Sequence, residues 1–359
     1  MADPKLTALV RAAIANVDIP GGEKLGAYSG LSEIIVTPSA IAFAISVEPG
    51  MEGAFGPARA DAQRAAEGVS EGRKVLVSLT SDRAPNAGNA QPAAQPSQGS
   101  GIPPKTPVNG VKHVVAVASG KGGVGKSTVA VNLALALKAL GQKVGVLDAD
   151  LYGPSVPRLL GLEGQPVVRD DELFTPMTAF GIEAMSIGSM LQGDQAVVWR
   201  GPMAASALRQ LLRETAWGDL DILVVDLPPG TGDIQLSLCQ QVELSGTVIV
   251  STPQDLALID ARKAIDMFRR LDVPLLGLVE NMSYFVAPDT GNRYDIFGHG
   301  GAQAAAGELG IPFLGEIPLH MAVRAQSDLG APVVTEMPDG PEAAAFNAAA
   351  ARLLGGGAL

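Results

Sequence analysis

The part of the chain that follows residue 110 alternates short apolar runs with longer segments of helical periodicity. The runs that predict strands are residues 113–118, 144–147, 222–225, 247–250 and 275–279. Strands buried on both faces of a parallel sheet have this unbroken apolar character. Because helical segments lie between the runs, the pattern predicts an α/β fold with a doubly wound, mostly parallel sheet.

The pattern before residue 84 is different and predicts a small α+β domain. A first helix is predicted from apolar positions at helical spacing, namely Leu6, Leu9, Val10, Ala13, Ile14 and Val17. Two strands at residues 34–36 and 41–45 flank a turn at 37–39, and a second helix is expected near residues 57–68. Alternating Val75, Val77 and Leu79 predict a third strand. The order is α-β-β-α-β, and the absence of an obvious catalytic cluster favours a small interaction domain.

A linker is predicted between these two parts. Residues 84–110 contain six prolines, four glycines and one charged residue, Lys105, without helical or strand periodicity. Proline-rich segments of this kind favour extended, solvated backbone. The expected organisation is an accessory domain at residues 1–83, a linker at 84–110 and the main α/β domain at 111–359.

Charge and cysteine content narrow the possible partners and location. The 359 residues carry a net charge of −11, with 47% apolar and 18% charged residues, as in globular proteins. A negative field of this kind repels nucleic-acid backbones and anionic lipids, so neither nucleic acid nor membrane is an expected partner. With one cysteine, Cys239, no intramolecular disulfide can form, and neither a signal sequence nor a long apolar span is visible. We therefore expect a cytoplasmic protein.

The first predicted strand of the main domain runs into a phosphate-binding motif. Its residues fit the pattern G-x-x-x-x-G-K-[ST]: Gly120, Lys121, Gly122, Gly123, Val124, Gly125, Lys126, Ser127 and Thr128. A predicted helix follows and ends near Gly141. Backbone N–H groups of such a loop face the phosphates of a nucleotide. Lys126 is expected to contact the β- and γ-phosphates, and the Ser127 hydroxyl to bind Mg²⁺.

A second lysine inside this loop, Lys121, points to a particular class of enzyme. The run GKGGVGKST resembles the deviant Walker A loop of the MinD/Mrp class of ATPases. The resemblance implies that Lys121 crosses a homodimer interface to the partner's ATP, as an arginine finger does. It also implies that Asp150, after the second strand, positions the attacking water, while Asp148 supports the Mg²⁺ shell.

The strand predicted at residues 222–225 is followed by Asp226, which is the Walker B arrangement. Asp226 is therefore expected to hold Mg²⁺ through water. Residues 228–233 follow directly and resemble switch II. In that segment a glycine N–H, here that of Gly230, senses the γ-phosphate.

A narrower resemblance covers the whole main domain, to the Mrp/ApbC/Nbp35 iron–sulfur carrier ATPases. The matching segments are residues 150–157, 199–203, 217–221, 280–284 and 296–301. The resemblance implies that Asn281, after the strand at 275–279, recognises adenine. It further implies that apo iron–sulfur client or scaffold proteins are partners. The first domain resembles the MIP18-type domain of bacterial members.

One departure from this family concerns the cluster. Members that hold an iron–sulfur cluster carry C-x-x-C after residue 285, so that a dimer supplies four thiolates. Here Ala287 and Thr290 occupy those positions. Cys239 fits a packed core thiol in a helix, and His299 fits a structural or surface histidine. We therefore predict no iron–sulfur ligands in the chain, although the resemblance itself implies a cluster.

Smaller departures concern other candidate ligands. Asp289, Asp295 and His299 are poorly suited to iron–sulfide. His113 belongs to no motif, and His320 stands where relatives often have an acid.

The leading hypothesis is a homodimeric, Mg²⁺-dependent ATPase that handles iron–sulfur clusters or their clients. The alternative is a MinD/ParA-like ATPase that cycles on a membrane or on DNA. Residues 343–354 contain a single cation, which is poor for an anionic bilayer. A third hypothesis, an electron donor resembling nitrogenase reductase, is disfavoured by the missing cysteines.

Overall fold

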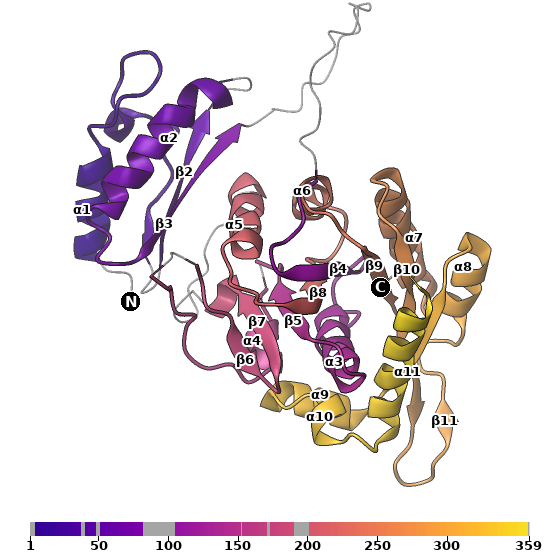
Figure 1. The fold of residues 1–359 in the computed structure, drawn as a ribbon. Helices are drawn as coiled ribbons and strands as arrows, with labels where there is room; N and C mark the ends of the chain where they lie inside the picture. Colours follow the sequence, from indigo (N-terminus) through magenta and orange to yellow (C-terminus); the bar gives the residue numbers. More distant parts are fainter. Residues whose placement is uncertain are drawn as a thin grey trace, which may run out of the picture. The chain divides into compact units, whose positions relative to one another are not determined.

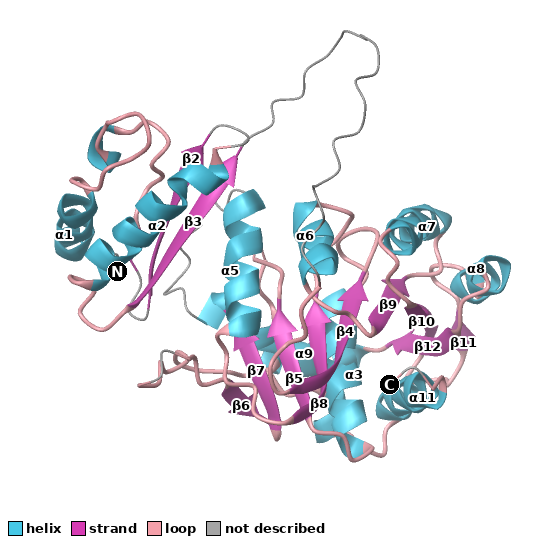
Figure 2. Ribbon diagram, turned by 45° about the horizontal axis from the view of Figure 1, so that its top comes forward, coloured by secondary structure: helices cyan, strands magenta, loops and turns pink. Residues whose placement is uncertain are grey.

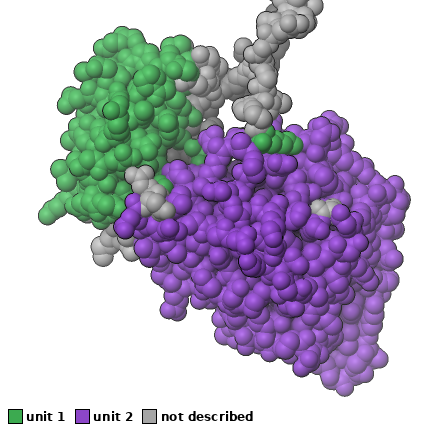
Figure 3. All heavy atoms as spheres, viewed as in Figure 1, with its two compact units in different colours: residues 1–105, 192–207 green, residues 106–191, 208–359 purple. Residues whose placement is uncertain are grey.

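The computed structural model describes residues 4–36, 40–47, 51–81, 105–151, 153–170, 173–189, 201–357 and 359. The chain divides into two compact units, shown in different colours in Figure 3. Unit 1 contains residues 1–105 and 192–207, and unit 2 contains residues 106–191 and 208–359. Most of the predicted linker and the predicted turn at 37–39 lie outside the described residues.

Unit 1 has the predicted α-β-β-α-β order. Its elements are α1 (Pro4–Ile14), η1 (Leu25–Ala27), β1 (Ile35–Val36), β2 (Ala40–Val47), α2 (Glu52–Glu67) and β3 (Lys74–Ser81). The sheet has the order β1-β2-β3, with β1 antiparallel and β3 parallel to β2. Leu6 and Val10 of α1 pack with Ile41 and Phe43 of β2 in a core of their own.

Helix α2 begins at Glu52, earlier than the predicted start near residue 57, and contains Pro57 in its interior. Phe55 is 4% exposed and joins Ala58 and Ala62 in the core of unit 1. These positions share one helix face, so burial of the Phe55 side chain stabilises the helical turn that precedes Pro57. Tertiary packing thus outweighs the tendency of proline to start a helix.

Unit 2 is built on a nine-stranded sheet, drawn in Figures 1 and 2. Its strands are β4 (Val111–Ala118), β5 (Val144–Asp148), β6 (Met177–Ala179), β7 (Ile182–Ser186), β8 (Leu220–Asp226), β9 (Gly246–Ser251), β10 (Leu275–Val286), β11 (Arg293–Tyr294) and β12 (Phe313–Leu319). The order is β11-β10-β9-β4-β8-β5-β7-β6, with β12 parallel to β10. Among the strands of this sheet in the described part of the chain, β6 and β11 alone run antiparallel to a neighbour. The predicted doubly wound, mostly parallel α/β fold is confirmed.

Helices cover both faces of this sheet (Figure 2). The helices of unit 2 are α3 (Lys126–Ala139), α4 (Val156–Leu159), η2 (Ile187–Ser189), α6 (Asp233–Gln241), α7 (Asp255–Arg270), α8 (Gly301–Leu309), α9 (Met321–Leu329), α10 (Val333–Glu336) and α11 (Pro341–Gly355). Helix α5 (Gly201–Arg213) begins in unit 1 and ends in unit 2. Helix α3 is buried nearly all round, since it lies between the sheet and α11. This burial fixes the N-terminus of α3 at the end of β4.

The five strands predicted from apolar runs are all present, but one of them is much longer than predicted. β10 continues to Val286, beyond the expected end at residue 279. Its first part pairs with β9 and β12, and its last part forms a hairpin with β11. Asn281 therefore lies within a strand and not after one. None of the helices in the described part of the chain combines the length and apolar character that a membrane span requires.

Candidate nucleotide-binding site

The phosphate-binding motif forms the turn between β4 and α3, and the structure explains three of its glycines, Gly120, Gly123 and Gly125. A Cβ on Gly120 would lie 2.1 Å from the backbone carbonyl carbon of Asp260 in α7. A Cβ on Gly125 would lie 2.3 Å from the side-chain nitrogen of Asn281. Gly123 and Gly125 also have φ of 82° and 77°, the left-handed region that favours glycine. Close packing therefore excludes a side chain at Gly120 and Gly125, and the backbone conformation favours glycine at Gly123 and Gly125.

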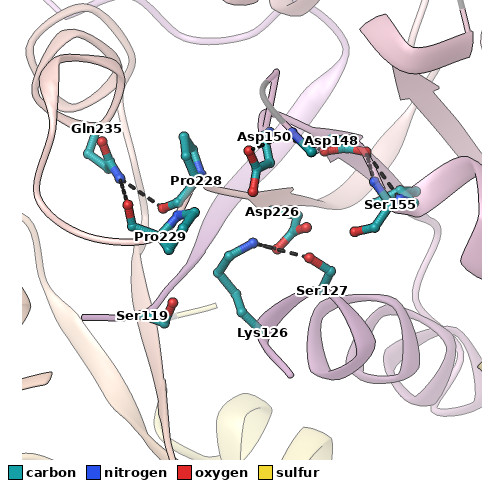
Figure 4. A network of polar contacts seen from close by, with 12 residues as sticks. Ser119, Lys126, Ser127, Asp148, Asp150, Ser155, Asp226, Pro228, Pro229 and Gln235 are labelled. Carbon is teal, nitrogen blue, oxygen red and sulfur yellow. Dashed lines mark hydrogen bonds and ion pairs between the residues drawn. The ribbon is translucent and has the colours of Figure 1, made fainter. Parts of the chain in front are cut away.

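A buried ion pair lies at the start of α3. Lys126 Nζ is 2.6 Å from Oδ1 of Asp226, with the lysine side chain 6% and the aspartate 0% exposed. The same Nζ donates to the Ser127 hydroxyl at 3.2 Å (Figure 4). The other carboxylate oxygen of Asp226, Oδ2, is buried and has no hydrogen-bond partner among the described residues. A buried acceptor without a partner is costly, so this oxygen fits a cation ligand better than a structural role.

The oxygens of Asp226 and Ser127 form a hard donor set, which suits Mg²⁺. Burial raises the pKa of Asp226, the nearby charge of Asp150 adds to this effect, and Lys126 opposes it. A divalent cation would oppose it in the same way as the lysine. The residues present therefore fit the ion that the sequence predicts.

Asp148 is fully buried opposite Asp226, with which it is in register across β5 and β8. Its carboxylate accepts hydrogen bonds from the backbone N–H groups of Asp150, Ser155 and Val156 at 3.1, 3.0 and 3.1 Å. The Ser186 hydroxyl donates to it at 3.2 Å. Burial, together with the charge of Asp226, raises the pKa of Asp148 to about 7. These contacts give Asp148 a structural task, which is to hold the loop that carries Asp150.

Two further predicted site residues, Asp150 and Gly230, follow the buried strands β5 and β8 in the chain. Asp150 Oδ1 accepts from the N–H of Gly153 at 3.3 Å, and Figure 4 draws its carboxylate beside Asp226. Gly230 N–H, the predicted sensor of the γ-phosphate, donates to the Ser119 carbonyl at 2.9 Å. In this conformation its hydrogen bond is therefore made within the protein. Lys121 is half-buried, and its ammonium makes no hydrogen bond or ion pair with the residues that the structure describes.

A pocket of about 340 Å³ opens beside the phosphate turn. Its lining includes Gly125, Thr128, Asn281 and residues of α9. Asn281 is 6% exposed and donates to the Val124 carbonyl at 2.8 Å, so its amide nitrogen is held by the phosphate turn itself. At the pocket wall, His320 Nδ1 accepts from the N–H of Ala322 and caps α9.

Ala287 and Thr290 lie apart from these residues, in the turn of the β10–β11 hairpin. Asn292 donates to Thr290 Oγ1, and its carbonyl accepts from the N–H of Ala287 at 2.9 Å. Cys239 is 1% exposed in α6, as expected of a core thiol.

The base of this hairpin is held by charges that the sequence did not indicate. The Arg293 guanidinium lies 4.0 Å from the centre of the Tyr284 ring and pairs with Asp295 and Glu316. Its NH2 group is also 2.7 Å from Nδ1 of His299. Arg293 thus links Tyr284, Asp295, His299 and Glu316 at the base of the hairpin.

Glu280 lies next to this cluster and is fully buried. Its carboxylate accepts from the N–H of Ala302 at 2.7 Å, and this bond caps the N-terminus of α8. The Ser283 hydroxyl donates to the same carboxylate at 2.6 Å. Glu280, His299 and Glu316 have ligand atoms within 4.8 Å of one another. Since the helix and Arg293 already satisfy them, the group is structural.

Comparison with known proteins adds an independent result. A family model described as the NUBPL iron-transfer P-loop NTPase, of the ParA class, matches residues 110–354. The sequence is 57% identical over 248 residues to the iron–sulfur cluster carrier protein of Deinococcus radiodurans, covering 68% of this chain and 70% of that protein. It is 51% identical over 248 residues to the iron–sulfur cluster transfer protein NUBPL of Mus musculus, covering 68% of this chain and 78% of that one.

Solved structures resemble the same part of the chain. A nucleotide-binding protein from Archaeoglobus fulgidus, in complex with ADP, is 43% identical with a TM-score of 0.56, covering 62% of this chain and 88% of that one. The cell division ATPase MinD of Pyrococcus furiosus is 22% identical with a TM-score of 0.52, covering 68% of this chain and 99% of that one. At that identity the MinD likeness shows the fold alone.

The structural task of Asp148 can be tested without nucleotide. Replacing Asp148 with Ala leaves buried backbone donors of the 150–156 loop unsatisfied, each worth about 1–3 kcal/mol. We expect the Asp148→Ala variant to lose about 2–4 kcal/mol of unfolding free energy in denaturant titrations with EDTA. The titrations are made at pH 6, below the pKa of about 7, where the Asp148 carboxyl is mainly protonated. Removal of this carboxyl then relieves little charge repulsion with Asp226.

Asp150→Ala is the matched control, because its carboxylate is not fully buried and accepts from the Gly153 N–H at the longer distance of 3.3 Å. Its unfolding free energy should change by less than about 1 kcal/mol. Equal stability of both variants and the parent in EDTA would show that Asp148 holds no loop.

Proposed function

Since the chain belongs to the NUBPL iron-transfer P-loop NTPase family, we propose that it is a Mg²⁺-dependent ATPase that carries iron–sulfur clusters or serves their apo-protein clients. The observation that carries the ATPase proposal is the buried pair of Lys126 and Asp226 with one unpartnered carboxylate oxygen. We further propose that it acts as a cytoplasmic homodimer.

The chemistry proposed for the site follows from exchange of this ion pair. Lys126 leaves Asp226 and contacts the β- and γ-phosphates of ATP, where its charge stabilises the transferring phosphoryl group. Ser127 and Asp226 would then hold Mg²⁺, which supplies positive charge against the phosphate oxygens. Backbone N–H groups of residues 120–128 would face the phosphates.

Adenine would occupy the pocket beside the phosphate turn. Asn281 is buried at its edge, and the bond from its amide nitrogen to Val124 fixes the side chain. The remaining carbonyl oxygen can accept a hydrogen bond from the amino group of adenine. A base with an acceptor at that position would leave this oxygen unpaired, which favours ATP over GTP.

Hydrolysis is proposed to require two subunits. Lys121 belongs to the deviant Walker A pattern and makes no ion pair with the described residues of its own chain. Its proposed partner is the ATP of the second subunit, while Asp150 positions the water in its own subunit's site. Asp148 supports that loop, with a contribution to the Mg²⁺ shell as a further part of the proposal.

Subunit mixing tests this division of labour. Lys121→Ala and Asp150→Asn should each lower ATP turnover, and Lys121→Ala should affect ATP affinity less, because its contact forms in the closed dimer. Mixed dimers of the two variants should regain activity. One of their sites keeps its own Asp150 and receives an intact Lys121 from the partner.

A mixture of Asp150→Asn with Lys126→Ala is the matched negative control, since each of its sites lacks a residue of its own subunit. Phosphate release is measured after mixed dimers have been verified. If Lys121→Ala and Asp150→Asn do not complement each other, both residues act within one site, and the proposal of a crossing lysine is wrong.

The cluster is treated as cargo, and the chain does not supply the thiolates for tight binding. Ala287 and Thr290 cannot replace cysteine, and Cys239 is buried in α6. A dimer therefore lacks four accessible thiolates, so delivery would need ligands from a client, a scaffold protein or a small thiol. We propose the MIP18-type domain at residues 1–83, joined by the linker at 84–110 to the ATPase domain at 111–359, as the part that contacts such partners.

Anaerobic iron–sulfide reconstitution tests the cluster proposal. The parent protein should retain little iron after desalting, whereas the double variant Ala287→Cys with Thr290→Cys should retain about four iron atoms per dimer. Iron content and visible absorption are measured for both. Cys239→Ser is the control for the buried thiol and should match the parent.

Retention of about four iron atoms by the parent would contradict the proposal. Loss of that iron in Cys239→Ser would then identify Cys239 as a ligand.

The alternative of a positioning ATPase on a membrane gains no support from α11. The apolar residues of this helix, including Phe346 and Leu353, are buried in the core with α3 and β12. This helix therefore has no free apolar face to offer a lipid surface.

A further inference from the structure

The loop that joins β8 to α6, residues 227–232, has few backbone donors of its own. Pro228 and Pro229 lack an N–H group, so Gly230 carries the first donor after Leu227. Leu227 N–H donates to the Val117 carbonyl at 3.0 Å, and Gly230 N–H donates to the Ser119 carbonyl at 2.9 Å. These two bonds attach one side of the loop to the end of β4.

The other side of the loop is attached by a single side chain, Gln235, which is 2% exposed in the first turn of α6. Its Nε2 lies 2.8 Å from the carbonyl oxygen of Pro228, 3.3 Å from that of Pro229 and 3.2 Å from that of Gly230. Figure 4 shows this amide directed at the two proline carbonyls. An amide NH₂ has two hydrogens, so three acceptors share them.

The two attachments meet on one peptide plane. In a trans peptide the carbonyl group and the following N–H point in opposite directions, and the described residues contain no cis peptide bond. Gln235 donates to the carbonyl of Pro229 at one edge of this peptide group. The Ser119 carbonyl accepts from the N–H of Gly230 at the opposite edge. The direction of the Gly230 N–H is therefore fixed by Gln235 and Ser119 together.

We propose that Gln235 is a positioning residue that directs the Gly230 N–H toward the γ-phosphate. This inference rests on the proposed function. When ATP binds, the N–H leaves the Ser119 carbonyl for the phosphate, and the Pro229 carbonyl of the same rigid peptide turns away from Gln235. The Gln235 amide keeps its bonds to the carbonyls of Pro228 and Gly230, which hold the rest of the loop in place. With three acceptors for two hydrogens, the amide gives up one contact during this movement and remains satisfied. Gly230 has φ of 88°, a conformation that suits glycine and permits such a turn.

The test compares ATP with ADP, since only ATP has the γ-phosphate. Gln235→Met keeps the side-chain length and removes the donors. Affinities for Mg²⁺–ADP and for a non-hydrolysable Mg²⁺–ATP analogue are measured by calorimetry, and kcat by phosphate release. We expect the ADP affinity to stay within about twofold, the ATP-analogue affinity to fall about tenfold, and kcat to fall by at least the same factor.

Gln241→Met on the same helix is the matched control, because the Gln241 amide donates to the Ser237 hydroxyl at 2.8 Å and does not contact the loop. It should resemble the parent in all three measurements. Gln235→Glu, which has one polar oxygen in place of the amide donor, serves if Gln235→Met does not fold, and it should also lose ATP preference.

Equal losses for ATP and ADP, or no loss, would overturn the positioning role. If the parent protein binds nucleotide but does not hydrolyse ATP, the proposed ATPase function is wrong. The ratio of ATP-analogue to ADP affinity still tests Gln235 in that case. A parent that binds neither nucleotide would reject both.

Discussion

The buried ion pair between Lys126 and Asp226 connects the elements on which the site depends. It joins the first residue of α3 to the last residue of β8, the strand next to β4. Removing two charges from water is expensive, and the attraction repays the cost only if the remaining polar atoms are satisfied. Here Oδ2 of Asp226 has no partner among the described residues. The pair is therefore a poor stabiliser of the fold and a good site for exchange with an anion and a cation.

In the described part of the chain, side chains around this pair hold the adjacent loops and do not provide the missing hydrogen bond to Asp226. Asp148 stands in register with Asp226 but directs its hydrogen bonds to the loop that carries Asp150. On the other side, Gln235 and Ser119 hold the loop that follows Asp226. Both loops are fixed by buried side chains with several bonds each. The groups proposed to act on ATP are thus positioned by their neighbours, while the lysine at the centre stays free to change partner.

The sequence predicted the sheet and the phosphate turn because both depend on local patterns. Apolar runs marked β4, β5, β8, β9 and the first half of β10, and the glycine-rich motif marked the start of α3. The second half of β10 was missed because its stability comes from pairing with β12, which is distant in sequence, and with β11, a two-residue strand that carries no pattern of its own. Short β6 and β11 carry little apolar signal of their own.

Site residues divide in the same way. Lys126, Ser127 and Asp226 follow motif spacing and lie together in the structure. Gln235 lies outside the motifs, and Glu280 was noted only as part of the matching segment 280–284. Their roles come from carbonyl and N–H groups that only the folded backbone brings to them. A buried glutamine three residues after a Pro-Pro-Gly-Thr-Gly segment is a weak signal by itself. The absence of cysteine at 287 and 290, in contrast, is a matter of composition and was visible from the sequence alone.

The claim that Lys126 exchanges Asp226 for a nucleotide phosphate is tested most directly by calorimetric titration with ATP, with and without Mg²⁺. The parent should bind Mg²⁺–ATP, with weaker binding in EDTA. Lys126→Ala should lower the affinity for Mg²⁺–ATP by roughly 100-fold, since a charge-assisted contact is lost. Equal affinity of the parent and Lys126→Ala would contradict the account.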